Sequence, residues 1–209
     1  MASALSLAPT GPRQITGRPI PRVWRALPLL LCLGALLGGA ALTAKALYIP
    51  AKAQVAQVLL ARAFDRSVES GAPVKPWSWA DTAPIAKVAI PRLGESDIVL
   101  SGGSGEAMAF GPTALVDDRS RRITVLAAHR DTHFSWVRDV EVGDIVTLER
   151  IDGARETFRI TRLETVRWDD FTYPADGGEG VLALTTCYPF DSHTPGPLRR
   201  VAWAERVGR

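Results

Sequence analysis

The chain has 209 residues, of which 46% are apolar, enough to build one folded domain with appendages and to exclude bulk disorder. Its formal net charge is only +3, and lysine and arginine alternate with aspartate and glutamate along most of the chain. Because no long basic block is present, the composition argues against a protein that binds nucleic acid.

The N-terminal part of the sequence has the pattern of a membrane anchor. Residues 1–25 carry four arginines, several prolines and no acidic residue, which predicts an unfolded basic tail. Residues 26–44 then run without a charge over about the length needed to cross a bilayer. Since the basic residues precede the apolar run, we expect a single transmembrane helix with a cytoplasmic N-terminus and an exported remainder.

A cleaved signal peptide is the alternative interpretation of the same run. It ends in small residues, among them Ala44 and Ala46, as a cleavage site would. Against cleavage, the run is longer than a usual signal core, and Tyr48 follows where an interfacial aromatic residue is expected. These features favour an anchor that is retained.

Residues 45–84 are predicted to form a membrane-proximal helix and a linker. Apolar residues recur at helical spacing between Ala51 and Arg66, and the following stretch to Asp81 is rich in glycine, proline and tryptophan. From residue 85 the pattern changes to short apolar runs separated by turn residues. The runs predict strands at 85–90, 97–100, 123–128, 145–150, 156–166, 181–186 and 198–205.

Two local signals refine the prediction for residues 85–209. Asp152-Gly153 lies between two predicted strands and indicates a hairpin turn. Ser104 is a suitable N-cap for a short helix that extends to Phe110. Many short strands at close spacing favour a mainly β domain, either a closed barrel or a sandwich.

The chain has two cysteines, Cys32 in the apolar run and Cys187 far downstream, so a disulfide between them is geometrically implausible. Cys187 ends the apolar strand 181–186 and precedes Tyr188-Pro189, where the strand must stop. A free thiol at a strand end is suited to be a nucleophile. A small hydrophobic residue that closes the strand is the alternative.

His129 ends the apolar strand 123–128, so it can meet Cys187 if the two strands are neighbours. A cysteine paired with a histidine is a common way to make a reactive thiolate, and Asp131 is a candidate to orient the imidazole. His129, Asp131 and His133 alternate in sequence, which also allows a metal site on one strand face. No further cysteine or histidine close in sequence completes such a site, so no metal is predicted.

Two adjacent arginines open the last predicted strand. Arg199 shares a strand face with Val201 and Trp203, whereas Arg200 has the opposite orientation. An arginine on an apolar face requires an anion or a carbonyl partner, because burial of an unpaired charge is unfavourable. Arg199 is therefore the candidate for a role beside a reacting group.

Together these residues resemble the sortases, a family of bacterial cysteine transpeptidases. The family signature Thr-Leu-x-Thr-Cys appears here as Ala-Leu-Thr-Thr-Cys at 183–187, the family's Gly-His as Ala128-His129, and the arginine of the final strand as Arg199. The first threonine and the glycine are thus both alanine, which affects fine geometry and leaves the chemical groups intact. The resemblance extends from about Tyr48 to the C-terminus.

Three strings resemble the proteobacterial class GN and class D branches in particular. They are Ile-Pro-Arg-Leu-Gly at 90–94, His-Arg-Asp-Thr-His-Phe at 129–134, and Cys-Tyr-Pro-Phe-Asp at 187–191. The resemblance implies a closed eight-stranded sortase-type β-barrel with short helices at residues 85–209. It also implies no cofactor, an inner-membrane location with a periplasmic or otherwise extracytoplasmic catalytic domain, and a substrate protein with a C-terminal sorting signal.

By this resemblance Cys187 is the nucleophile, His129 the proton donor, and Arg199 the group that stabilises the oxyanion or holds the substrate. Thr186 is expected to supply a hydroxyl or backbone donor. The acyl group passes to an amine or to water, and class GN relatives usually have a single dedicated substrate protein.

Two other functions remain open at this point. One is an L,D-transpeptidase-like cysteine enzyme of the envelope, although that family has its histidine a short distance before the cysteine, unlike His129 and Cys187. The other is an anchored β-domain that binds a partner without catalysis, which predicts an unreactive Cys187.

Overall fold

The computed structural model describes residues 22–192 and 194–208, with side chains from Leu27 onward. Most of the predicted basic tail, residues 1–21, lies outside the described part. The chain divides into two compact units, one up to Ile49 and the other from Pro50 onward. Each unit is described separately below.

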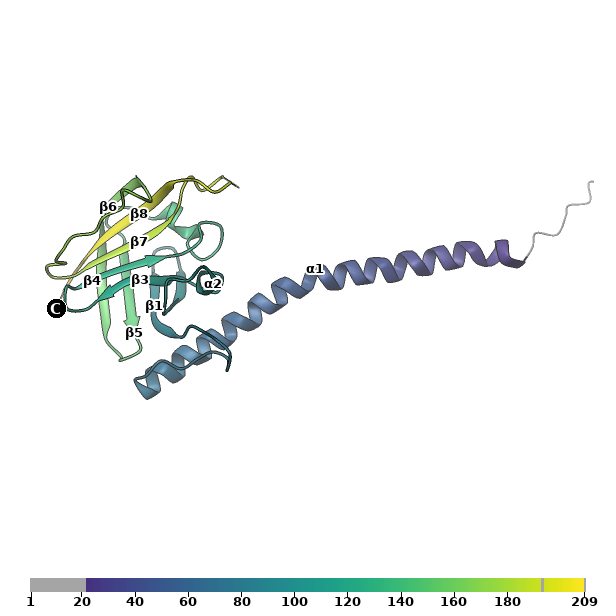
Figure 1. The fold of residues 1–209 in the computed structure, drawn as a ribbon, viewed down its shortest axis with the longest axis horizontal. Coiled ribbons are helices and arrows are strands. Elements are labelled where there is room, and N and C mark those ends of the chain that lie inside the picture. Colours follow the sequence, from purple (N-terminus) through teal and green to yellow (C-terminus); the bar gives the residue numbers. More distant parts are fainter. Residues whose placement is uncertain (1–21, 193, 209) are drawn as a thin grey trace, which may run out of the picture. The chain divides into compact units, whose positions relative to one another are not determined.

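A long helix, α1 (Arg22–Ser70), contains the predicted anchor (Figure 1). An 18-residue window within it has a mean hydropathy of 2.0, and its leucines are exposed, for example Leu29 and Leu42. By length and composition α1 is able to span a membrane, a test that a signal sequence near the N-terminus also passes. The helix continues without interruption past residue 44, so the anchor and the membrane-proximal helix are one element.

The second half of α1 belongs to the unit that starts at Pro50. Leu60 and Ala63 are fully buried, Phe64 is nearly so, and the side-chain amide of Gln57 donates a hydrogen bond to the carbonyl of Phe110 at 2.8 Å. The compact unit therefore begins well before the predicted boundary at residue 85, because this apolar helix face requires burial.

Eight strands close into a barrel in the order β1-β2-β3-β4-β7-β8-β6-β5 (Figure 1). The pairs β2–β3 and β4–β7 are parallel, and the other neighbours are antiparallel. The strands are β1 (Pro84–Ile90), β2 (Glu95–Leu100), β3 (Thr113–Asp118), β4 (Ile123–Ala127), β5 (Ile145–Arg150), β6 (Arg155–Arg167), β7 (Val181–Cys187) and β8 (Leu198–Arg206). A short helix α2 (Gly105–Met108) and a 3-10 helix η1 (Ser135–Asp139) lie in connections.

The strand pattern of the sequence is confirmed in seven of the eight strands. The missed strand is β3, whose sequence Thr-Ala-Leu-Val-Asp-Asp leaves alternate side chains exposed and ends in two acidic residues. The hairpin at Asp152-Gly153 is confirmed, with Gly153 in the left-handed region at φ 81°. The N-cap is confirmed as well, because the Ser104 hydroxyl accepts a hydrogen bond from the amide of Ala107.

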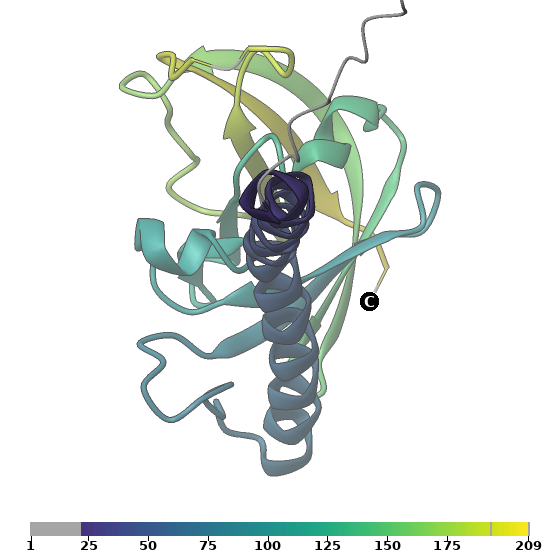
Figure 2. The same ribbon diagram turned by 90° about the vertical axis from the view of Figure 1, so that its right-hand side faces the viewer.

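Alternation along the strands divides the apolar residues between two sides of the sheet. Inside the barrel, Leu126 of β4, Leu184 of β7 and Ala202 of β8 join the main core. Outside, a second cluster contains Val125, Ala183, Val201 and Trp203, against which Phe171 of the β6–β7 connection packs. The long β6 crosses the barrel beside β8, as Figure 2 shows, and completes this outer face.

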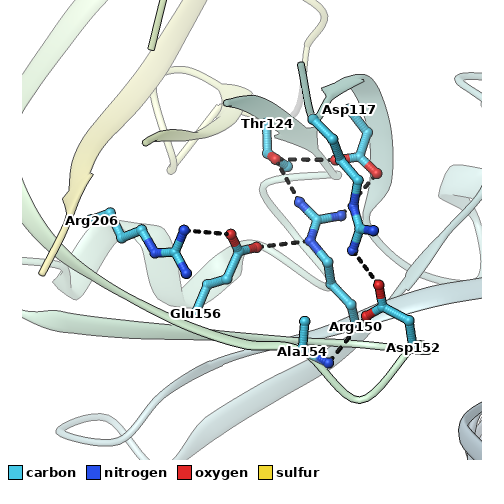
Figure 3. Close-up of polar contacts among 8 residues, drawn as sticks. Asp117, Thr124, Arg150, Asp152, Ala154, Glu156 and Arg206 are labelled. Carbon is cyan, nitrogen blue, oxygen red and sulfur yellow. Dashed lines mark hydrogen bonds and ion pairs between the residues drawn. The ribbon is translucent and has the colours of Figure 1, made fainter. Parts of the chain in front are cut away.

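A polar network lies at the end of the barrel where β4 and β7 begin (Figure 3). Arg150, whose side chain is 8% exposed, donates to Glu156 at 2.8 Å, to Asp117 at 2.9 Å and to the Thr124 hydroxyl at 3.0 Å. Arg206 also pairs with Glu156. Burial lowers the pKa of Arg150, but the two carboxylates outweigh it and raise the pKa above its ordinary value. The guanidinium is therefore always charged and depends on these partners.

We expect Arg150→Met to reduce the free energy of unfolding by about 3 kcal/mol or more, because it leaves Asp117 without its counter-ion and Glu156 with only the more distant Arg206. Urea unfolding of the full chain in detergent measures the change. The matched control is Arg155→Met, whose side chain is 78% exposed and pairs with Glu149 at the surface, where a change within about 0.5 kcal/mol is expected. Equal stability of the Arg150 variant and the native chain would contradict a structural role for this network.

Candidate active site

Three neighbouring strands bring the candidate catalytic residues to one end of the barrel. In the antiparallel pair β7–β8, Cys187 lies directly opposite Arg199. In the parallel pair β4–β7, Ala127 is level with Thr185, so His129, two residues further on, reaches the level of Cys187. Residues distant in sequence therefore lie at neighbouring strand ends, because β7 pairs with both β4 and β8.

Strand alternation also places Cys187 and Arg199 on the same side of the sheet. Both are in phase with residues of the outer apolar cluster, Ala183 on β7 and Val201 on β8. Arg200 lies opposite Thr186, and its side chain is on the other side of the sheet from that of Arg199. On the outer face of β7 and β8, the half-buried thiol and guanidinium thus lie next to a buried apolar cluster that supports the ends of both strands.

The three candidate groups are accessible to different extents. His129 is exposed, Cys187 and Arg199 are half-buried, and Cys187 is a free thiol. The Arg199 guanidinium donates through Nη1 to the carbonyls of Gly196 and Leu198, each at 2.9 Å. In this state Arg199 therefore contacts backbone carbonyls, the same kind of acceptor that a peptide substrate offers.

Thr186 was predicted to supply a hydroxyl or a backbone donor, and the structure shows where its hydroxyl lies. Its side chain is on the core side of β7, since it alternates with Cys187, and it is almost fully buried. The hydroxyl donates to the carbonyl of Ala128 at 2.7 Å. This hydrogen bond joins Thr186, which precedes Cys187, to Ala128, which precedes His129. The Thr186 hydroxyl therefore lies on the opposite side of β7 from the Cys187 thiol.

The segment after His129 is a turn, which removes the basis of the metal hypothesis. β4 ends at Ala127, and the amide of Phe134 donates to the carbonyl of His129 at 3.0 Å. Residues 129, 131 and 133 thus do not alternate on a strand face as the metal interpretation required. Among the described residues, no group of three or more His, Cys, Asp or Glu side chains is arranged to hold a metal ion.

His133 is held by β2. Its Nδ1 lies 2.8 Å from one carboxylate oxygen of Asp97, while Trp136 Nε1 donates to the other oxygen at 3.0 Å. Asp131 is exposed, and no hydrogen bond or ion pair joins it to another residue in the described part of the chain. The structure thus does not bring Asp131 against the His129 ring.

Comparison with known proteins agrees with this geometry. The family model of the sortase domain matches residues 88–207, more than half of the chain. The chain belongs to the sortase family. It is 30% identical over 125 residues to Sortase D of Bacillus subtilis (strain 168), a match that covers 56% of this chain and 61% of that protein. The chain thus matches less than two thirds of that relative's length.

Solved sortase structures share the fold of the barrel. Sortase C1 of Streptococcus agalactiae superposes with a TM-score of 0.53 at 23% identity, covering 60% of this chain and 68% of the other. Sortase A of Corynebacterium diphtheriae gives 0.54 at 18% identity, covering 63% and 64%. The closed eight-stranded architecture is therefore a sortase fold. The finer resemblance to class GN stays a prediction.

Reasoning from the sequence did not single out one buried residue beside the candidate site. Arg130 directly follows His129, is 9% exposed, and donates through Nη2 to the carbonyls of Ser192 and Thr194. A polar neighbour of the candidate histidine was visible in the sequence, but nothing there distinguished a buried arginine from the many exposed ones.

Proposed function

We propose that this sortase is a membrane-anchored cysteine transpeptidase. The Cys187 thiolate attacks the carbonyl carbon of a peptide bond in a sorting signal, and the electron pair of that carbonyl moves to oxygen. When the oxyanion collapses, the C–N bond breaks and the protonated His129 gives its proton to the leaving amine. Arg199 donates to the developing oxyanion or to the neighbouring substrate carbonyl.

The second half of the reaction resolves the thioester. An amine, or water, attacks the acyl carbon while His129 accepts its proton, and the C–S bond breaks to regenerate the Cys187 thiolate. No redox step or bound cofactor is needed for this sequence. The product carries the acyl group of the substrate protein on the acceptor.

The observation that carries the proposal is the register of β4, β7 and β8. It sets Cys187 opposite Arg199 and brings His129 to the same level, at the rim of a face that is otherwise apolar. A purely structural cysteine requires neither neighbour.

We expect one exported substrate protein with a C-terminal sorting signal, an amine acceptor, and a cell-membrane location with the barrel outside the cytoplasm. The apolar part of α1 supports the anchor by its length and composition.

The direct test uses the full chain in detergent, C-terminal peptides of exported proteins encoded beside it, and hydroxylamine as acceptor. We expect a mass increase on Cys187 equal to the acyl fragment, and its conversion to a hydroxamate when hydroxylamine is added. If neither product forms and the Cys187 thiol resists labelling, the result would instead support an anchored β-domain that binds a partner without catalysis.

The anchor is tested by its topology. A reporter enzyme that is active only outside the cytoplasm, fused after residue 209, should be active and should fractionate with membranes, because the basic residues precede the apolar run. A soluble mature protein that starts near Ala46 or Leu47 would instead support a cleaved signal peptide. N-terminal sequencing of the recovered chain distinguishes the two.

Substitution of the two arginines tests the proposed oxyanion group. Arg199→Ala should lower kcat/KM by roughly 10²–10³, the range for loss of one oxyanion donor. Arg200→Ala is the matched control, and it should be mild because Arg200 lies opposite Thr186 and has the other orientation. A larger loss with Arg200→Ala than with Arg199→Ala would show that Arg200, and not Arg199, is the oxyanion group. Steady-state rates of peptide cleavage provide the comparison.

A further inference from the structure

Arg130 connects the two segments that follow the candidate catalytic residues. It comes directly after His129, and its Nη2 donates to the carbonyl of Ser192 and, at 2.9 Å, to that of Thr194. Both carbonyls belong to the connection between β7 and β8, which begins right after Cys187. A single guanidinium group thus joins the histidine segment to the cysteine segment.

The environment of Arg130 is unfavourable for a residue that only stabilises the fold. The residue is 9% exposed. Among the residues that the structure describes, its buried Nη1 has no hydrogen-bond partner and no carboxylate forms an ion pair with it. A desolvated guanidinium with an unpaired donor costs stability that an apolar side chain of similar length would not. The arrangement therefore has a reason other than stability.

The β7–β8 connection is also in contact with Arg199. Arg199 Nη1 donates to the carbonyls of Gly196 and Leu198, so Arg130 and Arg199 hold the connection from two strands. A displacement of Thr194 or Gly196 would change where the Arg199 guanidinium lies relative to Cys187, its direct partner across the strands. Arg130 thus acts on the proposed oxyanion group through the backbone of the connection.

We infer that Arg130 is a positioning residue. It holds the backbone of the β7–β8 connection in one conformation and thereby fixes the position of the Arg199 guanidinium relative to Cys187. This inference rests on the proposed function. Arg130 takes no part in proton transfer and does not contact the thiol. Its contribution is orientation, for which a displacement of about 1 Å at a reacting group is enough to cost roughly 100-fold in rate.

The test compares Arg130→Met, which keeps the length and removes every donor, with Arg130→Lys, which keeps a charge and a donor. In the full chain, amide hydrogen exchange within residues 188–197 should rise by about 10-fold or more in the methionine variant and less in the lysine variant. The matched control is Arg138→Met, because Arg138 is exposed and donates to one carbonyl of the same connection, that of Phe190, at 3.2 Å. Its exchange should change by less than about 3-fold, since water replaces an exposed donor.

A second readout separates positioning from a general disturbance of the site. For Arg130→Met, acyl-enzyme formation with the peptide substrate should fall by roughly 10–100-fold. Alkylation of Cys187 by iodoacetamide, followed on the Cys187 peptide so that Cys32 does not contribute, should stay within about 2-fold across the pH range, because the thiol and His129 are untouched.

Two results overturn the inference. Exchange in 188–197 that is unchanged by Arg130→Met shows that Arg130 does not hold the connection. A parallel loss of alkylation and acylation shows that the substitution disturbs Cys187 itself. Failure of the native chain to form any acyl-enzyme refutes the proposed function instead, while the exchange measurement still decides whether Arg130 holds the connection.

Discussion

Cys187→Ala should abolish transfer to hydroxylamine and also abolish the covalent adduct with a peptide substrate. The reaction proposed for this chain passes through a thioester on that sulfur, so no partial route remains without it. Cys187→Ser should be nearly as inactive, because a hydroxyl is far harder to ionise than a thiol. Intact-mass measurement of the adduct and an assay of the hydroxamate product check the two parts of the expectation separately.

The matched control is Cys32→Ser, since Cys32 is the other free cysteine and lies in the apolar part of α1. It should leave both measurements unchanged. Full transfer by the Cys187→Ala variant would refute the cysteine mechanism. An adduct that persists in that variant and disappears with Cys32→Ser would show labelling at the wrong thiol.

His129→Ala should be about as damaging as loss of the thiol, because members of one catalytic unit do not contribute additively. Loss of a general acid alone typically costs about 10²–10⁴-fold, and here the same group also assists formation of the thiolate. Steady-state rates of peptide cleavage by the native chain and by the variant measure the loss.

His133→Ala is the control for this prediction. His133 belongs to the same turn but contacts Asp97 on β2 at 2.8 Å, so its loss should loosen the turn without removing the proton donor. We expect less than about 10-fold loss in kcat/KM. A chain that loses activity with His133→Ala and keeps it with His129→Ala would show that the general acid is misassigned.

Much of the barrel was predictable because its strands are short apolar runs with clear turn residues between them. Seven strands, the Asp152-Gly153 hairpin and the Ser104 cap follow from local pattern alone. β3 was missed because one face of that strand is exposed and its sequence ends in Asp117-Asp118. Its identity as a strand comes from pairing with β4, and only the folded chain supplies that partner.

The site was predictable in part. Cys187 and His129 each end an apolar strand, and alternation assigns Arg199 and Arg200 to opposite faces, all of which is local information. The positions of the Asp131 and Thr186 side chains were harder to predict. The sequence does not show that the chain turns after Ala128, nor that the Thr186 hydroxyl is used by a backbone carbonyl across the sheet.

The sequence by itself determined the strand ends, the free thiol, the apolar N-terminal run and the residue types available for chemistry, because these depend on neighbours within a few positions. The tertiary structure alone decided which strand ends meet. Insertion of β7 between β4 and β8 sets Cys187 level with His129 and opposite Arg199. It also decided that Arg130 is buried against the β7–β8 connection, because burial and long-range pairing depend on contacts between segments that no local pattern specifies.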